Sequence, residues 1–437
     1  MNHTSTKHFL MVMILLAVCL TASHAATYCV APMKMDNVII LRGAKSFAAN
    51  VTNYGNEAVS TISYTLYDTD SMKEVGAGTI TLDSLLAKGE SIGMEIPLPS
   101  GKTSNKQMLY LNITQVNGHA NEASDPYTYV TLYTVSHIPT RRMLVEDYTG
   151  MWCGYCPRGI VTMEYLRRQY PDKFIGVAIH CRNGSTDFLD VRAYGDVYRK
   201  WATGFPSVWV NRWRRVTDWN EGDRAFEQAM TAPAATDIEV KAVWANDSAD
   251  IEIETTVTPS VPADTGRFGI AYVLTEDGMT GSFWPQANYL SGEYYANAPE
   301  ELNRFVNGGN YIYGLSFDHT AITSMGIDRG VEDSFTEPLQ PEVPQLHYTS
   351  FSNIAQYSII QKKDSLSVVA MVIDRESGEI DNAAVCRIVE GELTGISSAS
   401  ATRRPVARSS RRYNLFGQPV DQNYKGIIVK DGKKTLQ

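Results

Sequence analysis

The stretch Trp152-Cys153-Gly154-Tyr155-Cys156-Pro157 decides the fold of the middle of the chain. An apolar run at residues 143–148 precedes it and predicts a buried strand, and apolar residues recur at helical spacing after it, over residues 163–170. Cysteines separated by two residues can close a disulfide, and a helix N-terminus stabilises a thiolate on the first of them. The pattern favours thiol–disulfide exchange, with Cys153 as the nucleophile and Cys156 as the thiol that resolves the mixed disulfide.

A zinc half-site and a structural disulfide are the alternatives for a lone Cys-x-x-Cys. A zinc site needs a second pair of ligands, and the sequence contains neither a second Cys-x-x-Cys nor two histidines at ligand spacing. Beyond residue 25 the cysteines number five, which is odd and too few for a disulfide scaffold. These five are Cys29, Cys153, Cys156, Cys181 and Cys386. We therefore expect redox chemistry without a metal or a cofactor.

The rest of the chain divides into regions of different pattern, and its 437 residues suggest about three domains. Residues 29–136 contain seven short alternating runs separated by turn residues, which predict an immunoglobulin-like β-sandwich. Strands and helices alternate over residues 140–232, which predicts an α/β domain. Residues 236–395 return to β patterns and predict a second sandwich. Within it, residues 281–348 predict an insertion of loops and short helices.

The N-terminal end of the chain predicts export. Residues 1–25 combine Lys7, an apolar run of 12 residues, and small residues at 23 and 25 before a cleavage site, as in a secretory signal peptide. A lipoprotein signal is the alternative, although no small residue precedes Cys19 or Cys29. The apolar run is shorter than the roughly 20 residues that cross a bilayer, and no later stretch qualifies, so we expect no transmembrane span.

Charge separates the C-terminal end from the body of the chain. The net charge is −9, yet the last 35 residues carry nine lysines and arginines against two aspartates. An acidic body excludes nucleic acid as a partner. Residues 397–412 are rich in Ser, Ala and Arg and predict a flexible linker. Residues 413–437 predict a small terminal module; the alternative is that residues 427–429 add an edge strand to the preceding sandwich.

The Trp-Cys-Gly-x-Cys pattern after a strand resembles the thioredoxin superfamily. The resemblance implies that Phe205-Pro206 is the cis-proline loop, which faces the disulfide and pairs with the bound substrate chain. Trp152, Phe205 and Trp209 are candidates to line a peptide groove, with aromatic core packing as the alternative for Trp209. The resemblance also implies that Asp147, six residues before Cys153, is the buried carboxylate that exchanges protons with Cys156. Glu146 competes for that role, and an acid exposed at the end of the strand is the alternative for Asp147.

A closer resemblance covers residues 143–386. Residues 144–159, Val177-Ala178-Ile179-His180 and Gly204-Phe205-Pro206-Ser207 resemble the outer-membrane-related thioredoxin-like proteins of Bacteroidetes, and residues 374–383 resemble the β domain that follows in that family. Residues 413–434 resemble the C-terminal sorting module of type IX secretion. These resemblances imply an exported protein at the outer membrane or cell surface, or a secreted one, with the periplasm as the alternative location.

The expected fold class is multidomain α+β, with a central thioredoxin-like α/β domain flanked by immunoglobulin-like β-sandwiches. Two functions compete for it. One is an exported thiol–disulfide oxidoreductase acting on protein thiols and disulfides of envelope or surface proteins, with a redox donor protein as a further partner. The other is a non-catalytic binding or adhesion protein that keeps the fold as a scaffold. His180 either orients the active-site loop or is a core-edge histidine, and Cys181 is either a third redox thiol or a buried free cysteine.

Overall fold

The computed structural model describes residues 26–98, 106–182, 187–231 and 233–393, together with the short stretches 412–414, 419–420, 427–430 and 433–436. The predicted signal peptide and all but the last residue of the predicted linker lie outside the described residues. The described chain is a β-rich α+β protein that falls into two compact units, Met1–Ile138 and Pro139–Gln437. Among the described residues, no helix is long and apolar enough to cross a membrane.

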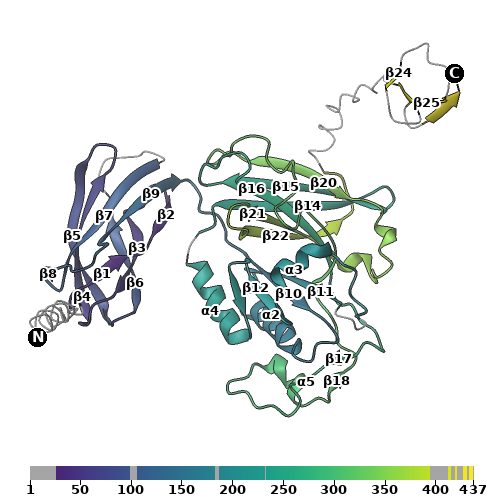
Figure 1. The fold of residues 1–437 in the computed structure, drawn as a ribbon, viewed down its shortest axis with the longest axis horizontal. Helices are drawn as coiled ribbons and strands as arrows, with labels where there is room; N and C mark the ends of the chain where they lie inside the picture. Colours follow the sequence, from purple (N-terminus) through teal and green to yellow (C-terminus); the bar gives the residue numbers. More distant parts are fainter. Residues whose placement is uncertain are drawn as a thin grey trace, which may run out of the picture. The chain divides into compact units, whose positions relative to one another are not determined.

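The first unit is a sandwich of two β-sheets (Figure 1). One sheet has the order β1-β3-β6, and the other has the order β2-β9-β7-β4-β5, with β8 paired to β7. Its strands are β1 (Val30–Pro32), β2 (Met35–Leu41), β3 (Ser46–Asn53), β4 (Val59–Asp68), β5 (Lys73–Leu86), β6 (Ser91–Pro97), β7 (Lys106–Val116), β8 (His119–Ala120) and β9 (Tyr127–Val135). Each of the seven runs that the sequence indicated lies inside one of these strands. Alternating apolar side chains such as Phe47, Ile62 and Leu111 come from both sheets and form one core.

The second unit is built on one sheet of eleven strands, in the order β13-β12-β10-β11-β19-β16-β21-β22-β14-β15-β20. These strands are β10 (Met143–Thr149), β11 (Phe174–His180), β12 (Ser207–Val210), β13 (Arg214–Val216), β14 (Thr236–Ala245), β15 (Asp250–Pro259), β16 (Phe268–Glu276), β19 (Thr320–Met325), β20 (Gln345–Phe351), β21 (Leu366–Asp374) and β22 (Ile380–Val389). Its α-helices are α2 (Pro157–Gln169), α3 (Tyr198–Trp201), α4 (Trp219–Met230) and α5 (Asn303–Val306), and its 3-10 turns are η1 (Gly195–Val197), η2 (Glu300–Leu302), η3 (Ile354–Gln356) and η4 (Lys363–Ser365). A short pair, β17 (Gln286–Ala287) with β18 (Tyr311–Ile312), lies apart from the sheet.

This sheet runs across the boundary that the sequence suggested near residue 233. Strand β11 pairs in parallel with β19 through Ala178 and Thr320, so residues 140–232 and 236–393 share their hydrogen-bonded sheet. Strand β19 and most of β20 also fall within residues 281–348, where the sequence indicated loops and short helices. Apolar and polar residues do not alternate along β19, which explains why this strand carried no signal.

At β10, different elements cover the two faces of the sheet. Helices α2 and α4 lie over one face, where Met143 and Val145 of β10 pack with Leu166 and Phe226 (Figure 1). The other face of β10 packs its alternate residues Leu144 and Tyr148 against Tyr194 and Trp201 around α3. Successive side chains of a strand point to opposite faces. The neighbouring acids Glu146 and Asp147 are therefore on different sides of the sheet.

The C-terminal residues form a small sheet of their own. Strands β23 (Arg412–Asn414), β24 (Pro419–Val420), β25 (Ile427–Lys430) and β26 (Lys433–Leu436) pair in the order β24-β23-β25-β26. In the described part of the chain, β25 pairs with β23 and β26. It is not an edge strand of the eleven-stranded sheet, which was the alternative for residues 427–429.

Candidate active site at Cys153 and Cys156

The two cysteines lie in the turn that joins β10 to α2. The Cys153 N–H donates to Gly150 O at 3.0 Å, and the Cys156 N–H donates to Cys153 O at 3.1 Å. These turns precede the helix, so α2 begins at Pro157, with Cys156 as its N-cap, rather than near Cys153. Both cysteines are free thiols and buried; Cys153 keeps 6% of its surface exposed, whereas Cys156 keeps none. Cys153 is therefore the thiol that solvent reaches.

The two thiols differ in acidity. A hydrogen bond from the Cys156 thiol lowers the pKa of Cys153; burial opposes this, and the N–H groups of Tyr155 and Cys156 add to the lowering. Burial raises the pKa of Cys156 well above its ordinary value, and its bond to Cys153 raises it further. At neutral pH the thiolate therefore forms first on Cys153, as the start of a helix favours.

Asp147 is buried under the first turn of α2, on the face of the sheet that α2 covers. Asp147 is only 1% exposed, and its Oδ1 has no hydrogen-bond partner among the described residues. A Cβ at position 159 would lie 2.5 Å from Asp147 Oδ2, so the glycine at that position makes room for the carboxyl. Burial, followed by the charge of Cys153, raises the pKa of Asp147 well above its usual range.

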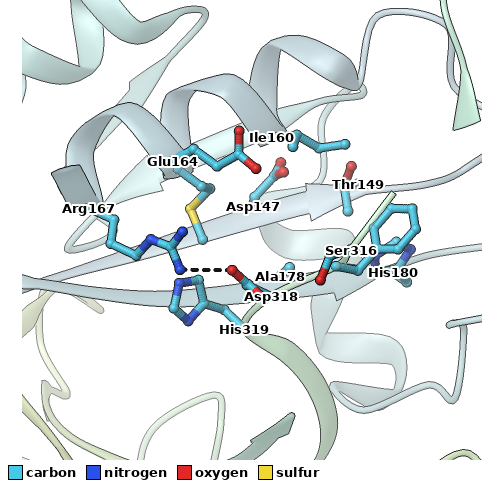
Figure 2. A pocket seen from close by; sticks show the side chains of 12 residues that line it. Asp147, Thr149, Ile160, Glu164, Arg167, Ala178, His180, Ser316, Asp318 and His319 are labelled. Atoms are coloured by element: carbon cyan, nitrogen blue, oxygen red, sulfur yellow. Dashed lines mark hydrogen bonds and ion pairs between the residues drawn. The ribbon is translucent and has the colours of Figure 1, made fainter. Parts of the chain in front are cut away.

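A cavity of about 40 Å³ extends from Asp147 along the sheet (Figure 2). Thr149 also lines this cavity, and its side chain lies close enough to Cys156 to lower the pKa of that thiol in part, against the larger effect of burial. The charged groups farther out are paired: Arg167 Nη1 lies 2.7 Å from Asp318 Oδ2, as the dashed line in Figure 2 marks, and Glu164 contacts Arg304 at 2.7 Å. Asp147 thus differs from the other two acids that line this cavity, since neither Arg167 nor Arg304 is its partner among the described residues.

Glu146, the competing acid, is held by partners on the opposite face. Arg212 donates to it from Nε and Nη2, both at 2.8 Å, and the Tyr194 hydroxyl donates to Oε1 at 2.8 Å. The side chains of Glu146 and Arg212 are fully buried, and Arg212 Nη1 also donates to Ile327 O at 2.8 Å. These contacts satisfy Glu146 within the core, and the sheet separates it from Cys156.

A buried His180–Asp187 pair supports the turn between β10 and α2 that carries the two cysteines, which we call the cysteine loop. His180 Nδ1 lies 3.0 Å from Asp187 Oδ2, and the same oxygen accepts the Met151 N–H at 2.8 Å. Burial raises the pKa of Asp187, but His180 and the N–H groups of Met151 and Leu189 outweigh it and lower that pKa overall. The sequence left two interpretations of His180, a residue that orients the loop and a core-edge histidine. Asp187, which makes the contact to the loop, was not among the candidates because nothing near it in sequence points to Met151.

The predicted substrate-binding residues gather at the end of β10. The Phe205–Pro206 peptide bond is cis, and the strand that follows pairs Ser207 with Tyr148 of β10. The rings of Trp152 and Phe205 meet edge to face, with centroids 5.1 Å apart. The Trp152 Nε1–H donates to Cys181 O at 2.8 Å, which fixes the indole beside the loop.

Residues 286–289 bind the backbone of the cysteine loop, which the sequence did not indicate. The Ala287 N–H donates to Met151 O at 2.7 Å, and the Tyr289 N–H donates to Gly154 O at 2.8 Å. Gln286 Nε2 donates to Cys153 O at 3.1 Å. A Cβ at position 154 would lie 2.4 Å from the Tyr289 ring, so this segment packs directly on the loop. More than 130 residues separate the partners, and no local pattern announces such a contact.

The remaining thiols and acids do not extend the site. Cys181 is buried, and burial raises the pKa of its thiol; its Sγ–H donates to Ile179 O at 3.4 Å. This environment is that of a buried free cysteine. In the part of the chain that the structure describes, no group of three or more His, Cys, Asp or Glu side chains could hold a metal ion.

Comparisons with known proteins give only weak likenesses. The sequence matches no protein-family profile and no curated protein. Among solved structures, HBP35 of Porphyromonas gingivalis is similar at 15% identity and a TM-score of 0.40, over 68% of this chain and 98% of that one. A domain of the outer membrane lipoprotein Omp28 from the same organism is similar at 14% identity and a TM-score of 0.18, over 36% and 100%. The structural neighbours of this chain thus include two proteins of Porphyromonas gingivalis, at scores too low to assign it a fold family or a function.

Proposed function

We propose that this protein is an exported thiol–disulfide oxidoreductase with a thioredoxin-like site that acts on the thiols and disulfides of envelope or surface proteins. The observation that carries the proposal is two free thiols in one turn with opposite pKa shifts, beside a buried carboxyl whose Oδ1 has no partner among the described residues. The connection β10–α2–β11, followed by antiparallel β12 and β13 and by α4, supports a thioredoxin-like reading. The Phe205–Pro206 loop beside Trp152 supports it further.

The first step is attack by the Cys153 thiolate on one sulfur of a substrate disulfide. A Cys153–substrate disulfide forms, the substrate disulfide breaks, and the leaving sulfur departs as a thiolate that takes a proton from water. The lowered pKa of Cys153 supplies the thiolate at neutral pH.

The second step needs a proton to leave Cys156, whose pKa is raised. The Asp147 carboxylate accepts that proton, and the Cys156 thiolate then attacks Cys153 Sγ and releases the second substrate thiolate. Two electrons pass from the protein dithiol to the substrate, and a second dithiol restores the protein; run backwards, the same steps oxidise a substrate. The raised pKa of Asp147 suits it to this role, because its carboxylate takes up a proton more readily than an ordinary one, and the protonated form returns that proton when the steps run backwards.

Trapping of the mixed disulfide tests this proposal. We expect the reduced protein to accelerate insulin reduction by dithiothreitol, and Cys156→Ser to accumulate a covalent complex with insulin through Cys153. Cys153→Ser should form none, while Cys181→Ser, which changes a buried thiol outside the turn, should behave as the unaltered protein. If the unaltered protein gives no acceleration, the competing function as a non-catalytic binding protein replaces the enzyme.

For the C-terminal sheet, β23–β26, we propose export or attachment to the cell surface. Its support is that these strands pair with one another and that the segment is basic, unlike the acidic body. Deleting residues 411–437 should leave insulin reduction and the melting temperature nearly unchanged, while the protein accumulates in the periplasm of its host. A large fall in melting temperature would place this sheet in the core instead.

A further inference from the structure

Most exposed aromatic side chains of the second unit belong to the cysteine loop or to segments of chain that are bonded to it. Among the unit's described residues, eight aromatic side chains are classed as exposed, and seven of them belong to the loop itself, to position 188 or to residues 283–313. These seven are Tyr155, Phe188, Phe283, Tyr289, Tyr294, Tyr311 and Tyr313, and the eighth is Trp213. Burial of aromatic surface drives much of protein association, so a concentration of exposed rings marks a binding surface.

Three of these exposed residues, Tyr155, Phe188 and Tyr289, lie in the loop or in segments bonded to it, and together with the half-buried Trp284 we call them the aromatic rim. Tyr155 lies between the two cysteines, and its ring meets Tyr289 edge to face at 5.4 Å. Tyr289 is 63% exposed although its backbone is bonded to Gly154 and its ring covers the α-carbon of that glycine. The rim is therefore joined to the turn that carries Cys153.

The other half of the rim approaches the loop from a different segment. Phe188 stacks on Trp284 with centroids 6.1 Å apart, and 46% of Phe188 stays exposed. Its neighbour Asp187 accepts the N–H of Met151, which joins this stack to the cysteine loop. Two stretches of chain that carry rim residues are thus hydrogen-bonded to the turn that carries Tyr155.

The hydrogen bonds from residues 286–289 to the cysteine loop limit the contacts that a substrate can make with this part of the loop. The carbonyl groups of Met151, Cys153 and Gly154 already accept hydrogen bonds from Ala287, Gln286 and Tyr289. A substrate chain on this side therefore meets exposed aromatic rings instead of free backbone acceptors. A small disulfide would reach Cys153 without covering the rim, whereas a polypeptide extended beyond its cysteine would lie across it.

We propose that the aromatic rim docks extended, unfolded polypeptides whose cysteine is flanked by apolar or aromatic residues. Such flanks bury themselves when a protein folds and are available only in an unfolded or misfolded chain. The inference rests on the proposed redox function and narrows its substrates to polypeptides that have not completed folding.

The test compares three disulfides with the full-length protein. One is a peptide disulfide with Trp and Tyr beside the cysteines, the second replaces both by Gly and Ser, and the third is oxidised glutathione. We expect Tyr289→Ser and Phe188→Ser each to lower kcat/KM for the aromatic peptide about 2- to 10-fold, as the loss of one ring contact predicts, with little change for glutathione. Trp213→Ser, an exposed ring outside the rim, is the matched control and should change neither rate.

Binding is measured separately, so that docking is tested even without redox activity. A fluorescent aromatic peptide with Ser in place of Cys should bind the unaltered protein more tightly than its Gly-Ser counterpart, and Tyr289→Ser should weaken that difference. Equal binding of both peptides, or equally tight binding of a folded protein with a surface disulfide, would overturn the docking proposal. Failure to reduce any of the three disulfides, with peptide binding intact, would overturn the redox function alone.

Discussion

Glu146 and Asp147 are adjacent carboxyls on one strand, and the two faces of the sheet treat them in opposite ways. On the α3 face, Glu146 receives three hydrogen bonds, two from Arg212 and one from Tyr194. On the α2 face, Asp147 is equally buried, yet its Oδ1 has no partner among the described residues. Glu146 is thus fully hydrogen-bonded whereas Asp147 is not, and the stability of the fold alone does not explain that difference.

The physical costs differ in the same direction. A buried ion pair with its hydrogen bonds satisfied needs no function, because each charge compensates the other. A buried carboxyl without a partner destabilises the fold whenever it is ionised, and groups of this kind cluster at functional sites. The glycine at position 159, which leaves space for Asp147, shows that the helix is built around this carboxyl. This contrast supports the proposal that Glu146 serves the structure and Asp147 transfers the proton.

The largest expected effect is on the rate of exchange. Asp147→Asn should slow the resolving step about 10²- to 10⁴-fold, because the replacement cannot accept the proton of Cys156. Stopped-flow tryptophan fluorescence of insulin or peptide reduction measures the rate. Glu146→Gln is the matched control and should retain the normal rate below its melting temperature. A normal rate in Asp147→Asn together with a slow one in Glu146→Gln would exchange the two roles.

The next effect concerns stability and reverses the order of the two residues. Glu146→Gln should lower the free energy of unfolding of the second unit by about 3–5 kcal/mol, because it leaves the buried Arg212 charge without its counterion. All seven tryptophans lie between residues 152 and 284, so tryptophan fluorescence in urea follows this unit alone. Replacing Glu146 with Gln and Arg212 with Met together should recover part of the loss. A loss below about 1 kcal/mol would mean that the pair behaves as a solvated one.

The sequence predicted the parts of this site that lie close together along the chain. Cys153, Cys156 and Trp152 share one motif, and Asp147 is at a short fixed offset from it, so spacing and resemblance were enough to select them. Whether Glu146 or Asp147 faces the cysteines could not be decided there, because that depends on which side of the sheet α2 covers. The seven strand runs of the first unit were visible for the same local reason, since each alternates along its own length.

Long-range contacts explain what the sequence left out. Gln286 meets Cys153 across 133 residues, and Asp187 meets Met151 across 36. Neither contact follows from periodicity or from a motif. Likewise, the pairing of β11 with β19 turned two expected domains into one continuous sheet, and a single parallel bridge between Ala178 and Thr320 carries no sequence signature.

The smallest expected effect is on the pH dependence of stability, and here too Glu146 and Asp147 should differ. Because burial raises the pKa of Asp147, the folded protein binds this proton more tightly than the unfolded chain, whose pKa is about 3.9. The stability from the bound proton is complete below the unfolded pKa and is lost as pH rises towards the folded pKa. Asp147→Asn stays neutral and loses nothing. Its free energy of unfolding should therefore exceed that of the unaltered protein at pH 8, by about 1.4 kcal/mol for each unit by which the pKa is raised.

Urea unfolding followed by tryptophan fluorescence from pH 4 to pH 8 measures this difference. The curves for Asp147→Asn and the unaltered protein should converge towards pH 4 and separate towards pH 8, with the variant more stable. Thr149→Val, which removes the other buried polar atom of the cavity without removing a titrating group, should shift stability equally at every pH. Parallel curves for Asp147→Asn would mean that its carboxyl is solvated in the folded protein. The contrast with Glu146 would then lose its physical basis, since both acids would be stabilised by partners, one by Arg212 and the other by water.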